Sequence, residues 1–380
     1  MLQTHDRSAR SALLAASLCF CAVACGNATH SGTAGAGGAA DCPAPNVKCY
    51  ATACCSASDA CSPGPTGQGV CASAGGSGGS DGGSGGGSCY TQRVVPARIA
   101  VGATTACAID SSGAAHCWGT PLAGAVPTPS STVSLLQLSG ESVYAAVKSD
   151  HSPVFWGGSG AFQGSPPTSS SFDQVVVTSD VIACGITTCG VVDCWPADAK
   201  RASSSAPTGV YQQLSAGFAH VCAIDDGQSL KCWGDDTYGQ TKAPTGSFKF
   251  VTSGDYHSCA VATDGHVECW GAHANSADAG PTAVDFGQAA PPSGTFKYLS
   301  GGRLHTCGIK DDDTVACWGL GTTVGDCAGM AECGQAMPPA DKFQQIAGGN
   351  TNTCGIKLDG SLACWGSNTG GRSTPPTDFK

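Results

Sequence analysis

Cysteine is the residue whose number and spacing in this chain most clearly offer chemistry. The sequence has 25 cysteines in 380 residues, and 22 of them follow position 25. Thiolates are nucleophiles and metal ligands, whereas paired thiols in an oxidising compartment form disulfides. The six cysteines between residues 42 and 71 lack the CxxC pairs of a zinc site, and that segment has no His. This thiol density therefore predicts a disulfide framework and an exported protein.

Twelve of the cysteines form six pairs whose members lie ten residues apart, and the second Cys of each pair directly precedes a Trp. We predict that each pair is a disulfide across a β-hairpin. In one such hairpin Cys259 faces Cys269, Val261 faces Val267, and Gly265 occupies the turn position that needs a positive φ. The pairs are Cys107 with Cys117, Cys184 with Cys194, Cys222 with Cys232, Cys259 with Cys269, Cys307 with Cys317, and Cys354 with Cys364.

One repeat has neither thiol. Ala145 and Phe155 occupy the two Cys positions there, so the thiols are lost together rather than singly. A bonded pair predicts this joint loss. Closing a loop of this size stabilises the fold by roughly 2.5 to 3 kcal/mol.

Histidines and acidic residues show no pattern typical of a catalytic or metal site. His220, His257 and His305 stand two residues before a Cys, but Thr105 and Asn352 replace them in sister repeats. Such exchanges favour a structural hydrogen-bonding role. No HExxH motif, phosphate-binding loop or GxSxG elbow occurs in a suitable context, and no regular calcium-loop series is present. We expect no catalysis, no metal and no cofactor.

The charge of the chain excludes one class of partner. Its 18 Lys and Arg against 28 Asp and Glu give a formal net charge of -10. A nucleic-acid binder needs clustered basic residues to displace counterions from phosphates. We therefore expect no nucleic-acid partner.

The first 24 residues resemble a signal peptide. Arg7 and Arg10 precede an apolar run, and the small residues 22–24 precede Cys25 and Gly26. These residues are similar to a bacterial lipobox, which implies lipidation of Cys25, a membrane anchor, and the outer membrane or cell surface of a Gram-negative bacterium. Plain secretion is the alternative. Lipidation leaves an even number of cysteines for pairing, which favours the anchor.

Two flexible linkers, residues 25–41 and 72–88, flank a cysteine-rich module at residues 42–71. Its cysteines follow the order single, single, double, single, single, which resembles the inhibitor cystine-knot (knottin) framework. That resemblance implies Cys42 with Cys55, Cys49 with Cys61, and Cys54 with Cys71. Six cysteines allow 15 connectivities, so a generic cysteine-rich spacer is the alternative.

Residues 89–380 repeat at intervals marked by Trp. The seven are Trp118, Trp156, Trp195, Trp233, Trp270, Trp318 and Trp365. Their fixed position beside a hairpin Cys favours packing between repeats over carbohydrate stacking. The chain ends with residues 375–380, where another strand would start, and the first repeat lacks the Phe that opens its sisters. We predict an all-β, seven-bladed β-propeller closed by joining its first and last blades.

The repeat GxxHxC, DG, CWG, GQ is read at Gly254, His257, Gly265, Trp270 and Gln288. It resembles the regulator of chromosome condensation repeat family. The short period is closer to the bacterial branch typified by β-lactamase-inhibitor protein II than to the eukaryotic repeat. The resemblance covers residues 90–380 and implies a propeller, whose function depends on its loops.

Two adjacent repeats are lengthened after their Trp. Trp233 to Gln240 takes seven residues, but Trp270 to Gln288 takes 18 and Trp318 to Gln335 takes 17. Because both insertions leave the scaffold at one equivalent point, we expect them to share one face of the ring and to carry recognition. The candidate binding residues are His273, Asn275, Asp278, Asp285, Phe286, Asp326 and Glu332, with Cys327 and Cys333 as a local disulfide.

These features favour a monomeric, non-catalytic scaffold that binds another protein or a cell-surface polymer. Cys89 and Cys189 remain, and a disulfide between them is one hypothesis for their pairing. One alternative, from the family resemblance, is inhibition of a secreted or periplasmic enzyme such as a β-lactamase. Another is a polysaccharide-active enzyme, which would need a carboxylate or His cluster in the central channel. Export disfavours the nucleotide-exchange role of eukaryotic relatives.

Overall fold

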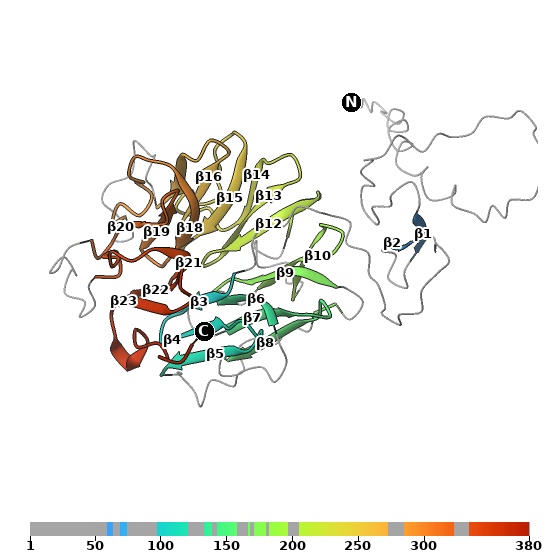
Figure 1. Ribbon diagram of the computed structural model, residues 1–380. Helices are drawn as coiled ribbons and strands as arrows, with labels where there is room; N and C mark the ends of the chain where they lie inside the picture. Colours follow the sequence, from blue (N-terminus) through green and yellow to red (C-terminus); the bar gives the residue numbers. More distant parts are fainter. Residues whose placement is uncertain are drawn as a thin grey trace, which may run out of the picture. The chain divides into compact units, whose positions relative to one another are not determined.

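The repeating segments form small antiparallel sheets because short apolar stretches alternate with turns rich in Gly and Asp. In the computed structural model, the described residues are 59–63, 69–73, 97–120, 133–138, 143–157, 166–167, 171–179, 182–196, 205–272, 285–322 and 334–379. The chain divides into two units, Met1–Ser80 and Asp81–Lys380. The second unit contains seven three-stranded sheets, here called blades (Figure 1).

The first blade contains β3 (Ile99–Val101), β4 (Thr105–Ile109) and β5 (Ala115–Gly119), the second contains β6 (Val133–Leu138), β7 (Val143–Lys148) and β8 (Pro153–Gly157), and the third contains β9 (Phe172–Val177), β10 (Ala183–Thr187) and β11 (Val192–Trp195). The fourth blade contains β12 (Tyr211–Ala216), β13 (His220–Asp225) and β14 (Leu230–Gly234), and the fifth contains β15 (Phe248–Ser253), β16 (His257–Ala262) and β17 (Val267–Gly271). The sixth blade contains β18 (Phe296–Gly301), β19 (His305–Lys310) and β20 (Val315–Gly319), and the seventh contains β21 (Phe343–Gly348), β22 (Asn352–Lys357) and β23 (Leu362–Gly366).

The second and third strands of each blade form the predicted hairpin. In the fifth blade Cys259 is opposite Cys269 and Val261 is opposite Val267. Gly265 has φ 95°, as its turn position requires. The Asp264 carboxylate accepts a hydrogen bond from the His266 backbone N–H at 3.1 Å, which closes the turn as an Asx motif. Local turn chemistry therefore sets the register of each hairpin.

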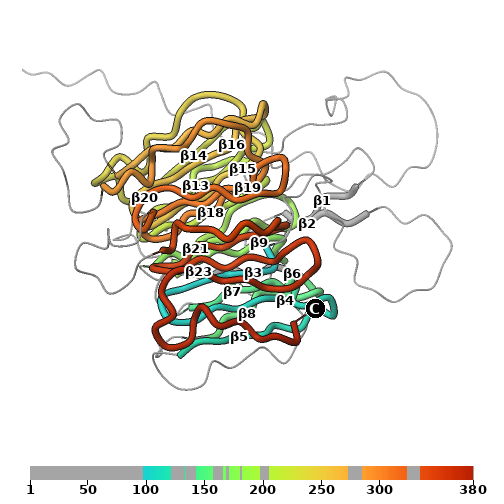
Figure 2. The backbone as a smooth tube through the Cα atoms, turned by 60° about the vertical axis from the view of Figure 1, so that its left-hand side comes forward, coloured from blue at the N-terminus to red at the C-terminus, as the bar shows by residue number. Residues whose placement is uncertain are grey.

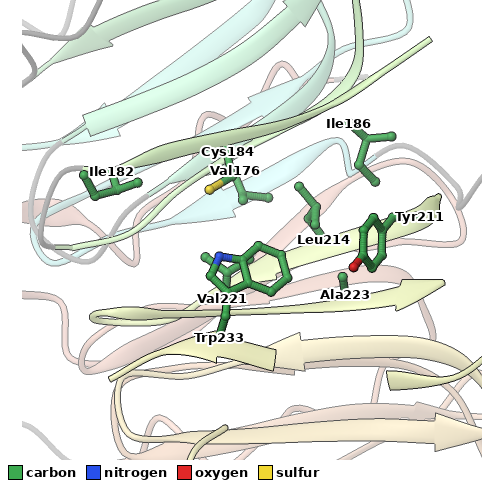
Figure 3. Close-up of a cluster of buried hydrophobic side chains, with 9 residues drawn as sticks. All are labelled: Val176, Ile182, Cys184, Ile186, Tyr211, Leu214, Val221, Ala223 and Trp233. Carbon is green, nitrogen blue, oxygen red and sulfur yellow. The ribbon is translucent and has the colours of Figure 1, made fainter. Parts of the chain in front are cut away.

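Seven hydrophobic clusters join neighbouring blades. Figure 3 shows the cluster between the third and fourth blades, where Trp233 packs with Ile182, Leu214 and Val221. Each of the other six clusters likewise contains the Trp of the later blade packed on the earlier one. The tryptophans therefore pack between blades.

Six blades contain a disulfide between their second and third strands, at the predicted pairs. The first Cys of each pair is fully buried and belongs to the cluster shared with the next blade. In the second blade Phe155 lies opposite Ala145, and its ring contacts Trp195 edge-on at 6.0 Å between centroids. An aromatic ring thus fills the space that a disulfide fills elsewhere.

The ring closes between the seventh and first blades, where β21 and β22 lie against β3 (Figure 1). Figure 2 shows β21 and β3 from another side. β3 has only three residues, whereas β12 has six. Phe379, buried in the cluster of these two blades, contacts the His116 ring edge-on. The end of the chain therefore closes the ring with a side chain rather than with a strand.

In the first unit the structure describes one hairpin, β1 (Asp59–Pro63) with β2 (Gly69–Ser73). Cys61 is opposite Cys71 in its backbone register. The knottin pairings also involve Cys42, Cys49, Cys54 and Cys55, which lie outside the described residues, as do the predicted signal peptide, Cys25 and the predicted linker 25–41. The predicted linker 72–88 overlaps β2 at residues 72–73, and the rest of it lies outside the described residues. Over the described part of the chain, no helix has the length and apolarity needed to span a bilayer.

Candidate binding surface

The two ends of the propeller differ in which connections they carry. The segment after each Trp begins beside the turn between the first two strands of the same blade. Backbone hydrogen bonds from Asp235 to Ala219, from Ala272 to Tyr256 and from Leu320 to Leu304 show this proximity. We call the surface made by these turns and post-Trp segments the loop face. The turns between second and third strands form the opposite hairpin face.

The GxxH motif forms the loop-face turns, and its glycine makes room for the imidazole. A Cβ on Gly254 would lie 2.2 Å from His257 Cε1 and 2.3 Å from the carbonyl oxygen of Gly302 in the next blade. Gly302 stands in the same relation to His305 and to Gly349. Glycine is therefore required by close approach, both within the blade and between blades.

Each of the three motif histidines bonds to the next blade. Nε2 of His220 lies 2.9 Å from Ser258 Oγ, Nε2 of His257 lies 2.7 Å from Thr306 Oγ1, and Nε2 of His305 lies 2.8 Å from Thr353 Oγ1. Thr306 donates its own hydroxyl proton to the Gln288 carbonyl at 3.0 Å. Its oxygen must therefore accept from His257, which places the imidazole proton on Nε2.

Burial keeps these histidines neutral. Desolvation lowers the pKa of His220 to about 4, of His257 to about 3, and of His305 to about 4. All three side chains have no exposed surface. They hold blades together as predicted, and no substrate can reach them.

The GQ step joins successive blades through its backbone. The indole N–H of Trp270 donates to the Gln240 carbonyl at 2.9 Å, and that of Trp318 donates to the Gln288 carbonyl at 2.8 Å. Arg372 takes the place of Gln after the last blade, and its carbonyl accepts from Trp118 at 2.8 Å. The side chain of Arg372 is also buried, so it joins Phe379 in closing the ring.

The first strands of the blades surround a narrow central cavity of about 100 Å³. Its lining includes Phe250 and Tyr298, whose rings lie 4.6 Å apart, together with small and aliphatic residues. Burial raises the pKa of Tyr298 to about 12. No Asp, Glu or His occurs among the described residues that line this cavity. The cluster that a polysaccharide-active enzyme would need is not in that lining.

An aromatic cluster lies on the loop face across the boundary of the fourth and fifth blades. Phe218 is 39% exposed and stacks on Tyr256 with centroids 5.8 Å apart and planes at 29°. Tyr238, from the segment after Trp233, meets Tyr256 edge-on at 5.1 Å. We call Phe218, Tyr238 and Tyr256 the aromatic cluster.

Charged side chains continue this surface around the mouth of the channel. Asp255 lies beside Tyr256, and its Oδ2 is 3.6 Å from Nε of Arg303 in the sixth blade. Burial, and then the negative charge of Asp255, raise the pKa of Tyr256. Asp255, Arg303 and Asn350 occupy equivalent turn positions and line the mouth together.

The structure places only two of the predicted binding residues. Asp285 is exposed and its carboxylate accepts from the Gly287 N–H at 3.1 Å, while the backbone N–H of half-buried Phe286 donates to Gln288 Oε1 at 2.7 Å. Both therefore shape the GQ turn. The other candidates, His273, Asn275, Asp278, Asp326 and Glu332 with Cys327 and Cys333, lie outside the described residues.

Both insertions begin on the loop face, because the backbone N–H groups of Ala272 and Leu320, just before them, donate hydrogen bonds to carbonyls in the turns of that face. Cys189 is half-buried in a turn on the hairpin face, and Cys89 lies outside the described residues. Among the described residues, no three His, Cys, Asp or Glu are grouped to hold a metal ion.

Sequence reasoning missed the aromatic cluster. Phe218 and Tyr256 occupy the two variable positions of GxxH motifs, and Tyr238 stands in a short post-Trp segment rather than in an insertion. The available signal was a large aromatic residue at the tip of a turn, where burial is incomplete. The sequence predicts recognition in the two insertions, and none of these three residues lies in either insertion.

The comparisons with known families support the repeat assignment. The model of the regulator of chromosome condensation (RCC1) repeat matches residues 211–240 and 248–276. These are the repeats of the fourth and fifth blades, which carry the aromatic cluster. A search of curated proteins finds no match.

Solved propellers share the fold. The CRINKLY WD40 ectodomain of the Arabidopsis thaliana receptor kinase ACR4 is 24% identical, with TM-score 0.55 over 71% of this chain and 97% of its own. The ectodomain of the Physcomitrella patens receptor kinase CR4 is 23% identical, with TM-score 0.57 over 71% of this chain and 74% of its own. Prp20p from Saccharomyces cerevisiae is 13% identical, with TM-score 0.53 over 70% of this chain and 81% of its own.

Proposed function

We propose that this chain is a non-catalytic binding scaffold that recognises another protein through the loop face of its propeller. The observation that carries the proposal is the difference between the two faces. The loop face bears the aromatic cluster and the starting points of both insertions. Exposed aromatic and Arg side chains are enriched at the energetic centres of protein interfaces.

The similar propellers support this role at the level of function class. The CRINKLY and CR4 propellers belong to the ectodomains of receptor kinases, and Prp20p binds Gsp1p and histones. A rigid ring suits recognition because its loops can vary while the blades hold them in place.

We also propose that the chain is exported and held at the cell surface by lipid on Cys25, with residues 25–41 and 72–88 as tethers. The disulfides in six blades are consistent with an oxidising compartment. Mass spectrometry of the chain isolated from its own cells tests this, since an unmodified Cys25 rules out the anchor.

A partner screen with matched loop variants tests the recognition role. In one variant, Gly-Ser linkers replace residues 273–284 and 323–333, which removes Cys327 and Cys333 together. The control changes Leu358 to Ser in a turn on the hairpin face, where that side chain is 53% exposed. We expect a partner captured by the unmodified chain to be retained by the control and lost by the loop variant. Equal capture by both variants contradicts recognition through the insertions.

A further inference from the structure

The aromatic cluster is an ordered surface. The turn that carries Phe218 is closed by a hydrogen bond from Gly217 N–H to the His220 carbonyl at 2.9 Å. The next turn is held by the bond of His257 to Thr306. These rings therefore need little ordering when a partner arrives.

Three carboxylates and two cations surround the aromatic cluster, so its surroundings carry a small net negative charge. Asp255 lies next to Tyr256 in the chain, and its carboxylate and that of Asp235 both act to raise the pKa of the Tyr256 phenol. Asp236 follows Asp235, is exposed, and lies 3.9 Å from the Lys242 ammonium group. Arg303 of the sixth blade lies 3.6 Å from the Asp255 carboxylate, and its positive charge acts to lower the pKa of the same phenol.

The exposed ring of Phe218, with carboxylates nearby, is suited to contact with a cationic side chain. The face of an aromatic ring carries negative charge density and attracts Lys or Arg, and a neighbouring carboxylate strengthens that attraction. The same carboxylates disfavour an acidic group, because like charges at an interface repel. The net charge of -10 further favours encounter with a basic partner.

We propose that the aromatic cluster, together with Asp255, is the docking point for a Lys or Arg side chain presented by the protein partner. This inference rests on the proposed function and specifies the chemistry of its contact. The cation lies over the exposed face of Phe218, with the Asp255 carboxylate beside it. Arg303 limits the site toward the sixth blade.

Binding of defined peptides to the full chain tests this contact. The probe is a fluorescein-labelled Gly-Ser peptide carrying Arg, compared with peptides in which citrulline or Glu replaces Arg. Citrulline keeps the shape of Arg without its charge. We expect the Arg peptide to bind about fivefold to tenfold more tightly than the citrulline peptide, and the Glu peptide to bind most weakly.

Matched variants separate the cluster from the general charge of the protein. Phe218→Ala keeps every charge, so a loss of about fivefold in Arg-peptide affinity identifies the ring itself. Asp255→Asn is expected to weaken binding by a similar factor. Leu358→Ala, which removes an exposed apolar side chain on the hairpin face, is expected to change nothing. Unchanged unfolding midpoints show that the variants are folded.

The inference is overturned if the Arg and citrulline peptides bind equally, or if Phe218→Ala behaves like Leu358→Ala. Its failure is distinguishable from failure of the proposed function. A natural partner that is lost by the variant with replaced insertions but retained by Phe218→Ala supports loop-face recognition and removes the cationic contact.

Discussion

The boundary between the third and fourth blades and the boundary between the sixth and seventh use the same strand positions in opposite ways. At the first boundary, Ile182 and Val221 share an apolar cluster. At the second, His305 donates to Thr353 across 2.8 Å. All four side chains are fully buried. These boundaries show two ways of filling the same positions without leaving a buried polar group unpaired: a polar side chain faces a polar one, or an apolar side chain faces an apolar one.

The same matching occurs at two further boundaries, but not where the seventh blade meets the first, because buried Asn352 and buried Ala106 occupy these positions there. Val143 lies with Ala183 in one apolar cluster, and the hydroxyl of Tyr144 bonds to that of Thr105. A mismatched pair would leave a buried donor or acceptor without a partner, which costs about 1 to 3 kcal/mol. The boundaries from the fourth to the seventh blade are therefore polar and pH-sensitive, whereas those around the third are apolar.

The largest expected effect is acid destabilisation of the polar half. The folded-state pKa values of the three motif histidines lie near 3 to 4, below the ordinary value of 6.5 for an exposed histidine. Below pH 6.5 the unfolded chain binds more protons, so stability falls as the pH drops toward 4. Each histidine contributes roughly 3 kcal/mol to this loss. Denaturant unfolding at pH 7 and pH 4.5 measures it.

Hydrogen exchange at the same two pH values locates the loss. We expect amides of β13, β16 and β19 to lose protection at pH 4.5 before those of β9 and β10, which pack at apolar boundaries. Uniform loss of protection across all blades would show that the histidines do not cause the acid sensitivity.

A smaller change in the free energy of unfolding is expected when the disulfide of one blade is replaced by an aromatic ring like that of the second blade. Replacing Cys222 and Cys232 by Ala is expected to lower the free energy of unfolding by about 3 kcal/mol through loss of the disulfide. The pair Cys222→Ala and Cys232→Phe copies the second blade, where Phe155 contacts Trp195. We expect it to recover about 1 kcal/mol through contact with Trp270.

Chemical denaturation of the two double variants measures that difference. If the Phe variant is no more stable than the Ala variant, the ring does not substitute for the disulfide, and the second blade is held by other contacts.

The smallest effect tests the matching rule directly. Thr353→Val removes the partner of His305 and is expected to cost about 1 to 3 kcal/mol. Adding His305→Ile makes an apolar pair like Ile182 with Val221, and we expect it to restore most of that loss. A double-mutant cycle gives the coupling energy. Additive losses in the double variant would contradict pairwise matching.

Much of the fold was predictable because its signals are local. Cys259 and Cys269 lie ten residues apart around Gly265, so the turn alone sets their register. Repetition then extended that hairpin around the ring. The sequence predicts that the first and last blades join, but not how they join. A strand is expected at Phe379, whereas this residue packs as a single side chain.

The candidate site was less predictable because exposure depends on neighbours that are distant in the sequence. Phe218 stacks on Tyr256 in the next blade, and no periodicity within one repeat shows that contact. Likewise, the carbonyl of Arg372 accepts from Trp118, although Arg372 does not match the Gln of the repeat.

The amino-acid sequence alone determined the repeat, the hairpin register and the positions of the six described disulfides. These depend on alternation with a period of two and on turns of a few residues. Tertiary structure alone decided which side chains meet between blades, which histidines are kept neutral, and which aromatic rings reach solvent. Those outcomes depend on packing between segments some 40 residues apart, as in the contact of His220 with Ser258, and burial there is a property of the closed ring.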